Sequence, residues 1–176
     1  MTYQSRSQRG EAATAFLRWL ADTAGHDAQV LPHVQCPERF PALRFVFMDR
    51  GDLLVGKHMI QVKWPTIAWR DRGSFPHEAM IIDEWHKAQR SASQGCVAYW
   101  ILSADLTCVC VFRMTDQRKL YKQKLFNSNQ DHQRHIEYAM SPLDCLEWIP
   151  IDRELLSLAL QFGIINPAWV TADGRF

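Results

Sequence analysis

The sequence predicts an α/β fold, on the border with α+β, in which a mixed central β-sheet is flanked by helices. Apolar residues recur at helical spacing over residues 11–24, 77–93 and 152–162. Short apolar segments typical of strands lie between these runs. The resulting order of helix, strand, hairpin, helix and strand pair is that of layered domains in which helices cover a sheet.

The first predicted element is a helix over residues 11–24, and it follows a polar segment, residues 1–9, that we expect to be disordered. A short strand is expected at 29–31 and an apolar, aromatic one at 44–48. The apolar residues that set the helical spacing are Ala13, Phe16, Leu17, Leu20 and Ala24.

Residues 51–63 predict a β-hairpin closed by a two-residue loop, Gly56 and Lys57. Glycine in the first position of such a loop indicates a type II′ turn. In this register Asp52 lies opposite Gln61. Directly opposed residues of paired strands have Cβ atoms about 5 Å apart, so we expect these two side chains to be neighbours.

Three polar side chains of the hairpin are expected to converge. Gln61 and Lys63 are two residues apart, so they project from the same face of their strand, and that face is also the face of Asp52. One carboxylate, one amide oxygen and one ammonium on an otherwise apolar sheet outline a metal-ion site. The alternative is an edge hairpin that carries polar residues on its solvent face to stay soluble.

Asp52 together with Gln61 and Lys63, in the spacing Gln-x-Lys, resembles the signature of the PD-(D/E)XK nuclease superfamily. That signature has an Asp at the start of one strand and Glu-x-Lys on the next. A Glu on a preceding helix usually completes it, and Glu11 stands at the matching place. The resemblance covers roughly residues 10–112. The Gln-x-Lys variant is similar to that of the endonuclease subunit of some heteromeric transposases.

The resemblance implies a restriction-endonuclease-like core and metal-dependent hydrolysis of DNA phosphodiester bonds. Asp52, Gln61 and Glu11 would be ligands of Mg²⁺ or Mn²⁺, which prefer oxygen donors. Lys63 would orient the nucleophilic water or stabilise developing charge. Gly51 stands where Pro is common in the superfamily, and Gln61 replaces an acid. For Glu11 the alternative is a favourable interaction with the helix dipole.

Residues 64–76 are rich in proline, aromatic residues and arginine, which predicts a loop over the open end of the hairpin. Arg70 and Arg72 are candidate phosphate contacts, and Trp69 is a candidate for stacking on a base. The alternative is a loop packed on the domain with its arginines solvated. A helix is expected to follow over 77–93.

Two strongly apolar runs, 96–102 and 107–112, predict a buried strand pair that ends the core at about residue 112. We expect residues 113–176 to form a C-terminal helical extension. Its most basic part, 113–124, predicts a helix that could contact a phosphate backbone. A solvated helix face is the alternative. The candidate nucleic-acid contacts in this part are Arg118, Lys119 and Lys122.

The chain has 176 residues, and we expect residues 10–176 to form a single domain. Hydrophobic residues at 47% and charged residues at 22% are ordinary for a soluble globular protein. The formal net charge of +1 excludes a global electrostatic bias, so nucleic-acid binding requires a local basic surface. No run approaches the ~20 apolar residues of a transmembrane helix, which predicts no membrane contact and a cytoplasmic protein.

The five cysteines form no Cys-x-x-Cys pair, and their odd number predicts free thiols. Most of them lie in apolar segments, where a buried thiol is ordinary.

The leading hypothesis is a metal-dependent endonuclease acting on DNA, with RNA left open. The chain has no evident separate recognition domain, so dimerisation or a protein partner would supply specificity. The alternative is an inactive nuclease-like scaffold that binds nucleic acid or a protein. A third hypothesis is an unrelated globular domain in which the motif occurs by chance.

Overall fold

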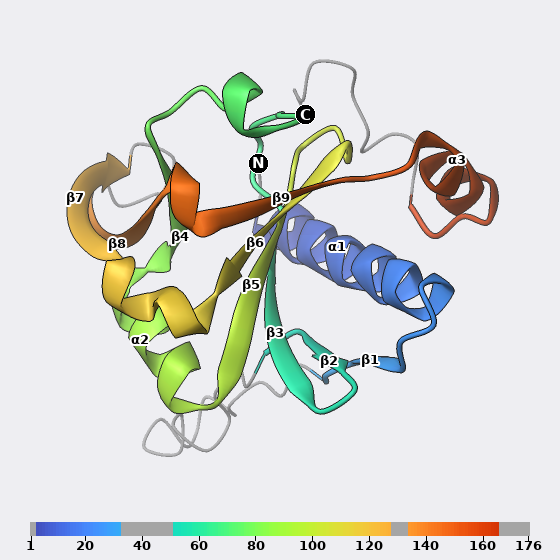
Figure 1. The fold of residues 1–176 in the computed structure, drawn as a ribbon, viewed down its shortest axis with the longest axis horizontal. Coiled ribbons are helices and arrows are strands. Elements are labelled where there is room, and N and C mark those ends of the chain that lie inside the picture. Colours follow the sequence, from blue (N-terminus) through green and yellow to red (C-terminus); the bar gives the residue numbers. More distant parts are fainter. Residues whose placement is uncertain (1–2, 33–50, 128–133, 166–176) are drawn as a thin grey trace.

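The computed structural model describes residues 3–32, 51–127 and 134–165, which form an α+β arrangement of helices and two β-sheets (Figure 1). The larger sheet has six strands in the order β1-β2-β3-β5-β6-β9. Neighbouring strands are antiparallel except β3 and β5, which are parallel. The six strands are β1 (Ala28–Val30), β2 (Leu53–Val55), β3 (His58–Lys63), β5 (Cys96–Leu102), β6 (Cys108–Arg113) and β9 (Leu146–Pro150).

The predicted hairpin is confirmed in position, and its register is confirmed as far as Leu53. The expected pair of Asp52 with Gln61 is not part of this register, because the N–H of Asp52 donates to the carbonyl of Ile60. Leu53 pairs with Ile60, and the strands continue in step to the turn. Gly56 has φ of +58°, whereas Lys57 stays outside the left-handed region. This combination is the one a type II′ turn requires.

The strands β3 and β5 are parallel, so a long crossover must connect them. A tight turn joins only antiparallel strands. The crossover contains the strand β4 (Ala79–Glu84) and the helix α2 (Trp85–Ser93). The predicted helix over 77–93 is therefore wrong in its first half. Burial alternates along β4, since Met80 and Ile82 are buried and Ile81 is exposed, and this period of two is that of a strand.

The smaller sheet has three antiparallel strands in the order β4-β8-β7. The strand β7 (Tyr121–Asn127) replaces the helix that we expected in the basic segment, after a short 3₁₀ helix at Met114–Lys119. The strand β8 (Arg134–Pro142) follows. Residues 113–176 are thus not a helical extension. Their described part contributes strands to both sheets and ends with the helix α3 (Arg153–Gln161).

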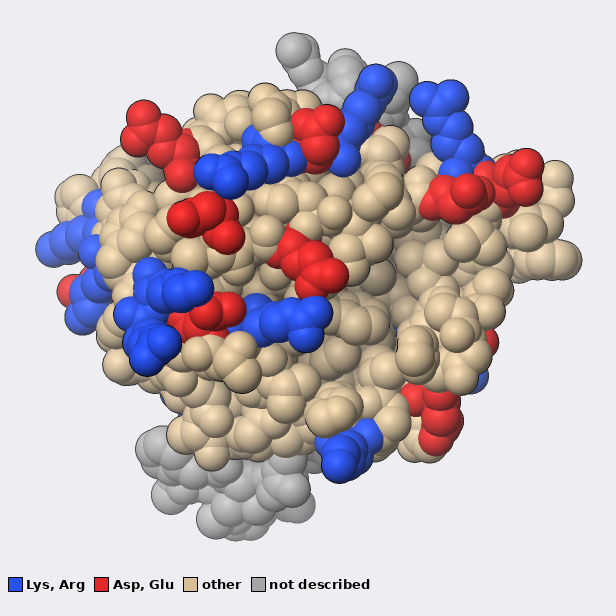
Figure 2. Space-filling model, in the orientation of Figure 1, with Lys and Arg blue, Asp and Glu red and all other residues tan. Residues whose placement is uncertain are grey.

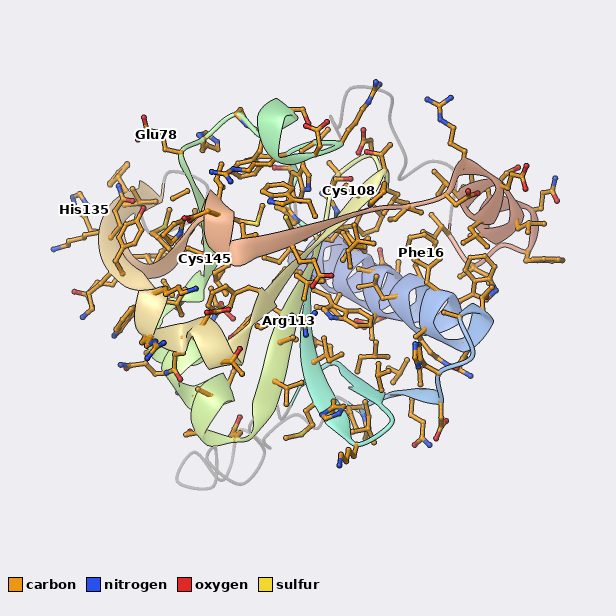
Figure 3. The ribbon with its side chains drawn as sticks, in the orientation of Figure 1. Phe16, Glu78, Cys108, Arg113, His135 and Cys145 are labelled. Atoms are coloured by element: carbon orange, nitrogen blue, oxygen red, sulfur yellow. The ribbon has the colours of Figure 1, made fainter. Side chains whose placement is uncertain are left out.

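Two apolar layers cover the two faces of the larger sheet. On one face Phe16 of the helix α1 (Tyr3–Thr23) packs with Ile60 and Val62, and α3 joins the same cluster through Ala159. On the other face Met80 and Ile82 of β4 pack with Tyr99 and Ile101 of β5. Figure 3 shows Phe16 and Glu78 on opposite sides of the sheet. The larger sheet therefore separates a helical layer from the smaller sheet.

The N-terminal helix begins at Tyr3, so residues 3–9, which we expected to be disordered, are helical. Arg9 explains this difference. Its side chain is buried, donates a hydrogen bond of 2.8 Å to the carbonyl oxygen of Pro65, and lies 4.6 Å from the ring centre of Trp64. These tertiary contacts stabilise the helical turn around Arg9, which the polar composition of residues 1–9 alone does not predict.

The other predicted elements are confirmed with small changes of bounds. The strand expected at 29–31 is β1, and the C-terminal helix expected at 152–162 is α3. Asp152 caps α3, because its side chain accepts hydrogen bonds from the first turn. The strand expected at 44–48 lies outside the described residues. Within the described ranges, no helix is long and apolar enough to span a membrane.

The described cysteines are free, as predicted. Cys96, Cys108 and Cys110 are buried in the larger sheet, whereas Cys145 is partly exposed. Figure 3 labels Cys108 and Cys145. Burial raises the pKa of Cys108 to about 11. These thiols therefore act as small apolar side chains at neutral pH.

Candidate functional site

Asp52 directly precedes β2, where the pairing of β2 with β3 ends at Leu53 and Ile60. From there its side chain bonds to the backbone of β3. Its carboxylate accepts a hydrogen bond of 2.6 Å from the backbone N–H of Val62. Its own N–H donates to the carbonyl of Ile60, and its carbonyl accepts from the N–H of Leu31, both at 3.0 Å. The carboxylate is thus fixed beside β3 at the position of Gln61 and Val62.

Gly51 explains why proline is missing before this aspartate. Its φ is +129°, which proline cannot adopt and other side chains rarely do. A Cβ atom there would also lie 3.3 Å from the carbonyl oxygen of Ile60. Proline therefore does not fit the backbone at residue 51.

Gln61 and Lys63 lie on the same face of β3, as the alternation predicts. Gln61 pairs with Tyr99 and Lys63 pairs with Ile101, and both partners belong to the apolar layer under β4. Gln61 is 5% exposed. A neutral amide suits this buried position better than a second carboxylate, because burying an unpaired charge costs far more.

Lys63 is held by a carboxylate that the sequence analysis missed. Its ammonium lies 2.8 Å from the carboxylate of Asp83, whose side chain is 10% exposed. The ammonium also lies 5.9 Å from the ring centre of Tyr99. Asp83 follows an irregularity in the β4–β8 pairing, and such bulges redirect side chains. The available sequence signal was the acidic pair at the end of the apolar run 79–82.

A buried hydroxyl lies next to this ion pair. Tyr99 is fully buried, and its hydroxyl lies near Ser91 and Asp83 without a well-formed hydrogen bond to any described residue. Burial raises the pKa of Tyr99 well above its ordinary value, and the Asp83 charge adds to this shift. The hydroxyl therefore stays protonated and can donate a hydrogen bond.

Cys96 is a buried thiol at the start of β5. Burial is the main cause that raises the pKa of its thiol. The negative charge of Asp52 raises it further, and the positive charge of Lys63 lowers it. The Lys63 ammonium itself contacts Asp83, and the Asp52 carboxylate accepts from the N–H of Val62.

Glu11 is not brought to this face. It is exposed on α1, and that helix packs on the face that carries Ile60 and Val62. Gln61 and Lys63 project from the opposite face. The carboxylate in contact with Lys63 is Asp83 instead.

The loop between β3 and β4 is ordered by its own hydrogen bonds. Asp71 accepts from the backbone N–H of Ser74 at 2.8 Å, and the Ser74 hydroxyl accepts from the N–H groups of Arg70 and Asp71. The hydrogen bonds from Ser74 lower the pKa of Asp71. Arg70 and Arg72 are exposed on this loop, as phosphate contacts would need to be. Trp69, the candidate for base stacking, is instead buried at 2% exposure.

The basic segment after β6 is largely neutralised by acidic neighbours. Lys119 pairs with Asp116 at 2.8 Å, and Lys122 pairs with Glu137 at 2.9 Å. Arg118 is exposed in the same segment. Figure 2 shows acidic and basic side chains interspersed on this side of the molecule. These residues therefore form no uniform basic patch.

The donor set around Asp52 fits one metal chemistry better than another. In the ranges 3–32, 51–127 and 134–165, no three His, Cys, Asp or Glu side chains group as metal ligands. A structural zinc site, which needs four such ligands, does not fit. Mg²⁺ keeps several waters and binds through one or two carboxylates, and the Asp52 carboxylate and the Gln61 amide are oxygen donors of the kind it prefers. Gln61 is 5% exposed, which limits its access to a hydrated ion.

Comparison of the chain with protein-family models, curated proteins and solved structures gives no match. These comparisons therefore place the chain in no family. The interpretation of the site depends on the contacts of Asp52, Gln61, Lys63 and Asp83.

Proposed function

We propose that the protein is a Mg²⁺- or Mn²⁺-dependent endonuclease that hydrolyses phosphodiester bonds of DNA. The observation that carries this proposal is the placement of three side chains by one hairpin. Asp52 is fixed beside β3, and Gln61 and Lys63 project from one face of β3. A carboxylate, an amide and an ammonium in this arrangement suit a metal-bound phosphate.

The connectivity around the hairpin supports a restriction-endonuclease-like core. One helix precedes three antiparallel strands, and a crossover that contains α2 leads to β5, which is parallel to β3. The smaller sheet is an addition to this arrangement, and it supplies Asp83. Because one fold hosts many functions, the connectivity supports the proposal only together with the side chains.

Each side chain has a separate role in the proposed reaction. Asp52 and Gln61 would hold the ion, which when bound lowers the pKa of a coordinated water and neutralises phosphate charge. Lys63 has three N–H donors, of which one points to Asp83, and it donates another to a phosphate oxygen as negative charge develops. Asp83 is a positioning residue that fixes the direction of the ammonium.

Substrate binding in this proposal depends on local charge. The net charge of +1 gives little long-range attraction, so exposed Arg70 and Arg72 on the adjacent loop would contact the backbone. Such contacts carry no sequence information. Dimerisation or a protein partner would therefore supply specificity, and RNA is an alternative substrate.

A second candidate function is an inactive scaffold that binds nucleic acid or a protein. The burial of Gln61 and the contact of Lys63 with Asp83 favour it, because both restrict access of a phosphate to these groups. In this candidate, the Lys63–Asp83 pair only joins the two sheets.

Cleavage and binding of the same DNA separate the two candidates. Plasmid, linear, single-stranded and branched DNA are incubated with the full chain and Mg²⁺, Mn²⁺ or EDTA, and binding is followed in EDTA. The endonuclease cuts at least one substrate only when metal is present. Binding without cutting under every metal condition identifies the scaffold and overturns the nuclease proposal.

A further inference from the structure

A cavity of about 730 Å³ lies between the loop that follows β3 and the smaller sheet. Its walls are mostly apolar, and His77, Glu78 and Gln123 add polar groups. Concave apolar pockets of this size with a few polar side chains are typical of small-ligand sites. The cavity is large enough for a nucleobase with its sugar.

The cavity is lined by neighbours of the proposed catalytic lysine, although Lys63 itself does not line it. Pro65, two residues after Lys63, lines it, and so does Ile101, which is the cross-strand partner of Lys63. The carboxyl ends of the parallel strands β3 and β5 therefore meet at the cavity. In open α/β sheets, ligands bind outside the carboxyl ends of the parallel strands.

Four of the residues that line the cavity carry aromatic rings. Trp69 and Phe75 meet edge to face with ring centres 5.3 Å apart, and Phe75 contacts the His77 ring at 5.6 Å. Tyr121 of β7 also lines the cavity and is 43% exposed. Packed aromatic rings beside the exposed rings of His77 and Tyr121 suit a planar heterocycle, because bases stack on aromatic side chains whatever their sequence.

The loop separates its aromatic side chains from its charges. Trp69 and Phe75 line the cavity, whereas Arg70 and Arg72 are exposed. This division matches a nucleotide, whose base is apolar on its faces and whose phosphate is charged. The carboxylate of Glu78 and the amide of Gln123 provide acceptors for the amino groups on base edges.

We propose that this cavity takes an unstacked nucleobase of the strand whose phosphate lies at Lys63. This inference rests on the proposed function and specifies its substrate class as single-stranded or locally unpaired nucleic acid. A paired base does not enter, since enzymes reach a base in a duplex only by taking it out of the stack. The cavity would thereby fix the position of the strand next to the cleavage site.

The test is binding of a fluorescent single-stranded oligonucleotide to the full chain in EDTA, against the same sugar-phosphate chain without bases. We expect the abasic strand to bind roughly tenfold more weakly, because stacking of one base is worth about 1–3 kcal/mol. Tyr121→Ala should remove most of this difference, and Tyr121→Phe, which keeps the ring, should preserve it. Phe126→Ala is the matched control, since Phe126 is an exposed aromatic of β7 outside the cavity.

The inference is overturned if both strands bind equally, if neither binds, or if Tyr121→Ala and Phe126→Ala behave alike. Metal-dependent cutting by the same preparation is measured separately. Cutting with base-independent binding leaves the proposed function standing and removes the cavity from it. Base-dependent binding without any cutting overturns the nuclease but supports a base-binding cavity.

Discussion

The Lys63 ammonium and the Asp83 carboxylate lie 2.8 Å apart although they belong to different β-sheets. Lys63 ends β3 of the larger sheet, and Asp83 lies near the end of β4 of the smaller sheet. The Lys63 side chain is 35% exposed, so solvent screening limits the contribution of the pair to about 1 kcal/mol or less. The main proposed effect of this ion pair is therefore to orient the Lys63 ammonium.

Asp83→Asn keeps the shape of the side chain and removes its charge. We expect cleavage to slow by roughly tenfold, since a loosely held donor stabilises the transition state less well. The free energy of unfolding should change by about 1 kcal/mol or less. Glu147→Gln is the control. Glu147 forms an ion pair of 2.6 Å with exposed Arg113, and neither residue belongs to the hairpin. An unchanged rate in Asp83→Asn would remove the positioning role.

Asp52 has a structural contact and a proposed metal contact, and two variants separate them. Asp52→Asn keeps an oxygen acceptor for the N–H of Val62, so it should fold with near-normal stability and lose cleavage. Asp52→Ala leaves that N–H without its acceptor, which should cost about 1–3 kcal/mol in urea unfolding. Full cleavage by Asp52→Asn would show that the carboxylate charge is not needed for metal binding.

Arg9 should stabilise the domain, although it lies in a segment whose composition suggested disorder. Its guanidinium is buried against Trp64 and donates to Pro65, and burial lowers its pKa to about 10. We expect Arg9→Ala to lower the free energy of unfolding by about 1–3 kcal/mol. Arg18→Ala, on the same helix but exposed, should cost about 0.5 kcal/mol. Equal effects in thermal or urea unfolding would contradict the anchoring role of Arg9.

Alkaline pH should destabilise the fold through its buried thiols. Burial raises the pKa of Cys108 from 9.0 to about 11, so the unfolded chain loses this proton first. Stability is then complete below pH 9 and falls as pH rises towards 11, by about 2–3 kcal/mol for this thiol. Cys108→Ala should show a smaller fall than the wild type in urea unfolding across this range. A parallel fall in both proteins would exclude Cys108 as its cause.

The hairpin and its side-chain faces could be predicted from sequence because they are local. A glycine that adopts positive φ fixes the turn at Gly56, and alternation then places Gln61 and Lys63. The cap of α3 is equally local, since Asp152 bonds to its own first turn.

The missed elements depend on partners far along the chain. In the segments 79–84 and 121–127, the pattern of apolar and polar residues is compatible with either a helix or a strand. Both segments form strands because they pair with β8. Asp83 could not be assigned to the site for the same reason. Its contact with Lys63 exists only because β4 packs across the larger sheet.

The central claim is that Lys63 acts in metal-dependent cleavage, and the most direct measurement compares two lysines of one hairpin. Lys63→Ala and Lys57→Ala are assayed with the best-cut DNA in Mg²⁺ and in Mn²⁺, alongside the wild type. Lys57 is exposed in the turn, so its variant should cut at the wild-type rate. Our account predicts that Lys63→Ala remains folded and loses cleavage by at least about a hundredfold. Equal cutting by the two variants would contradict it.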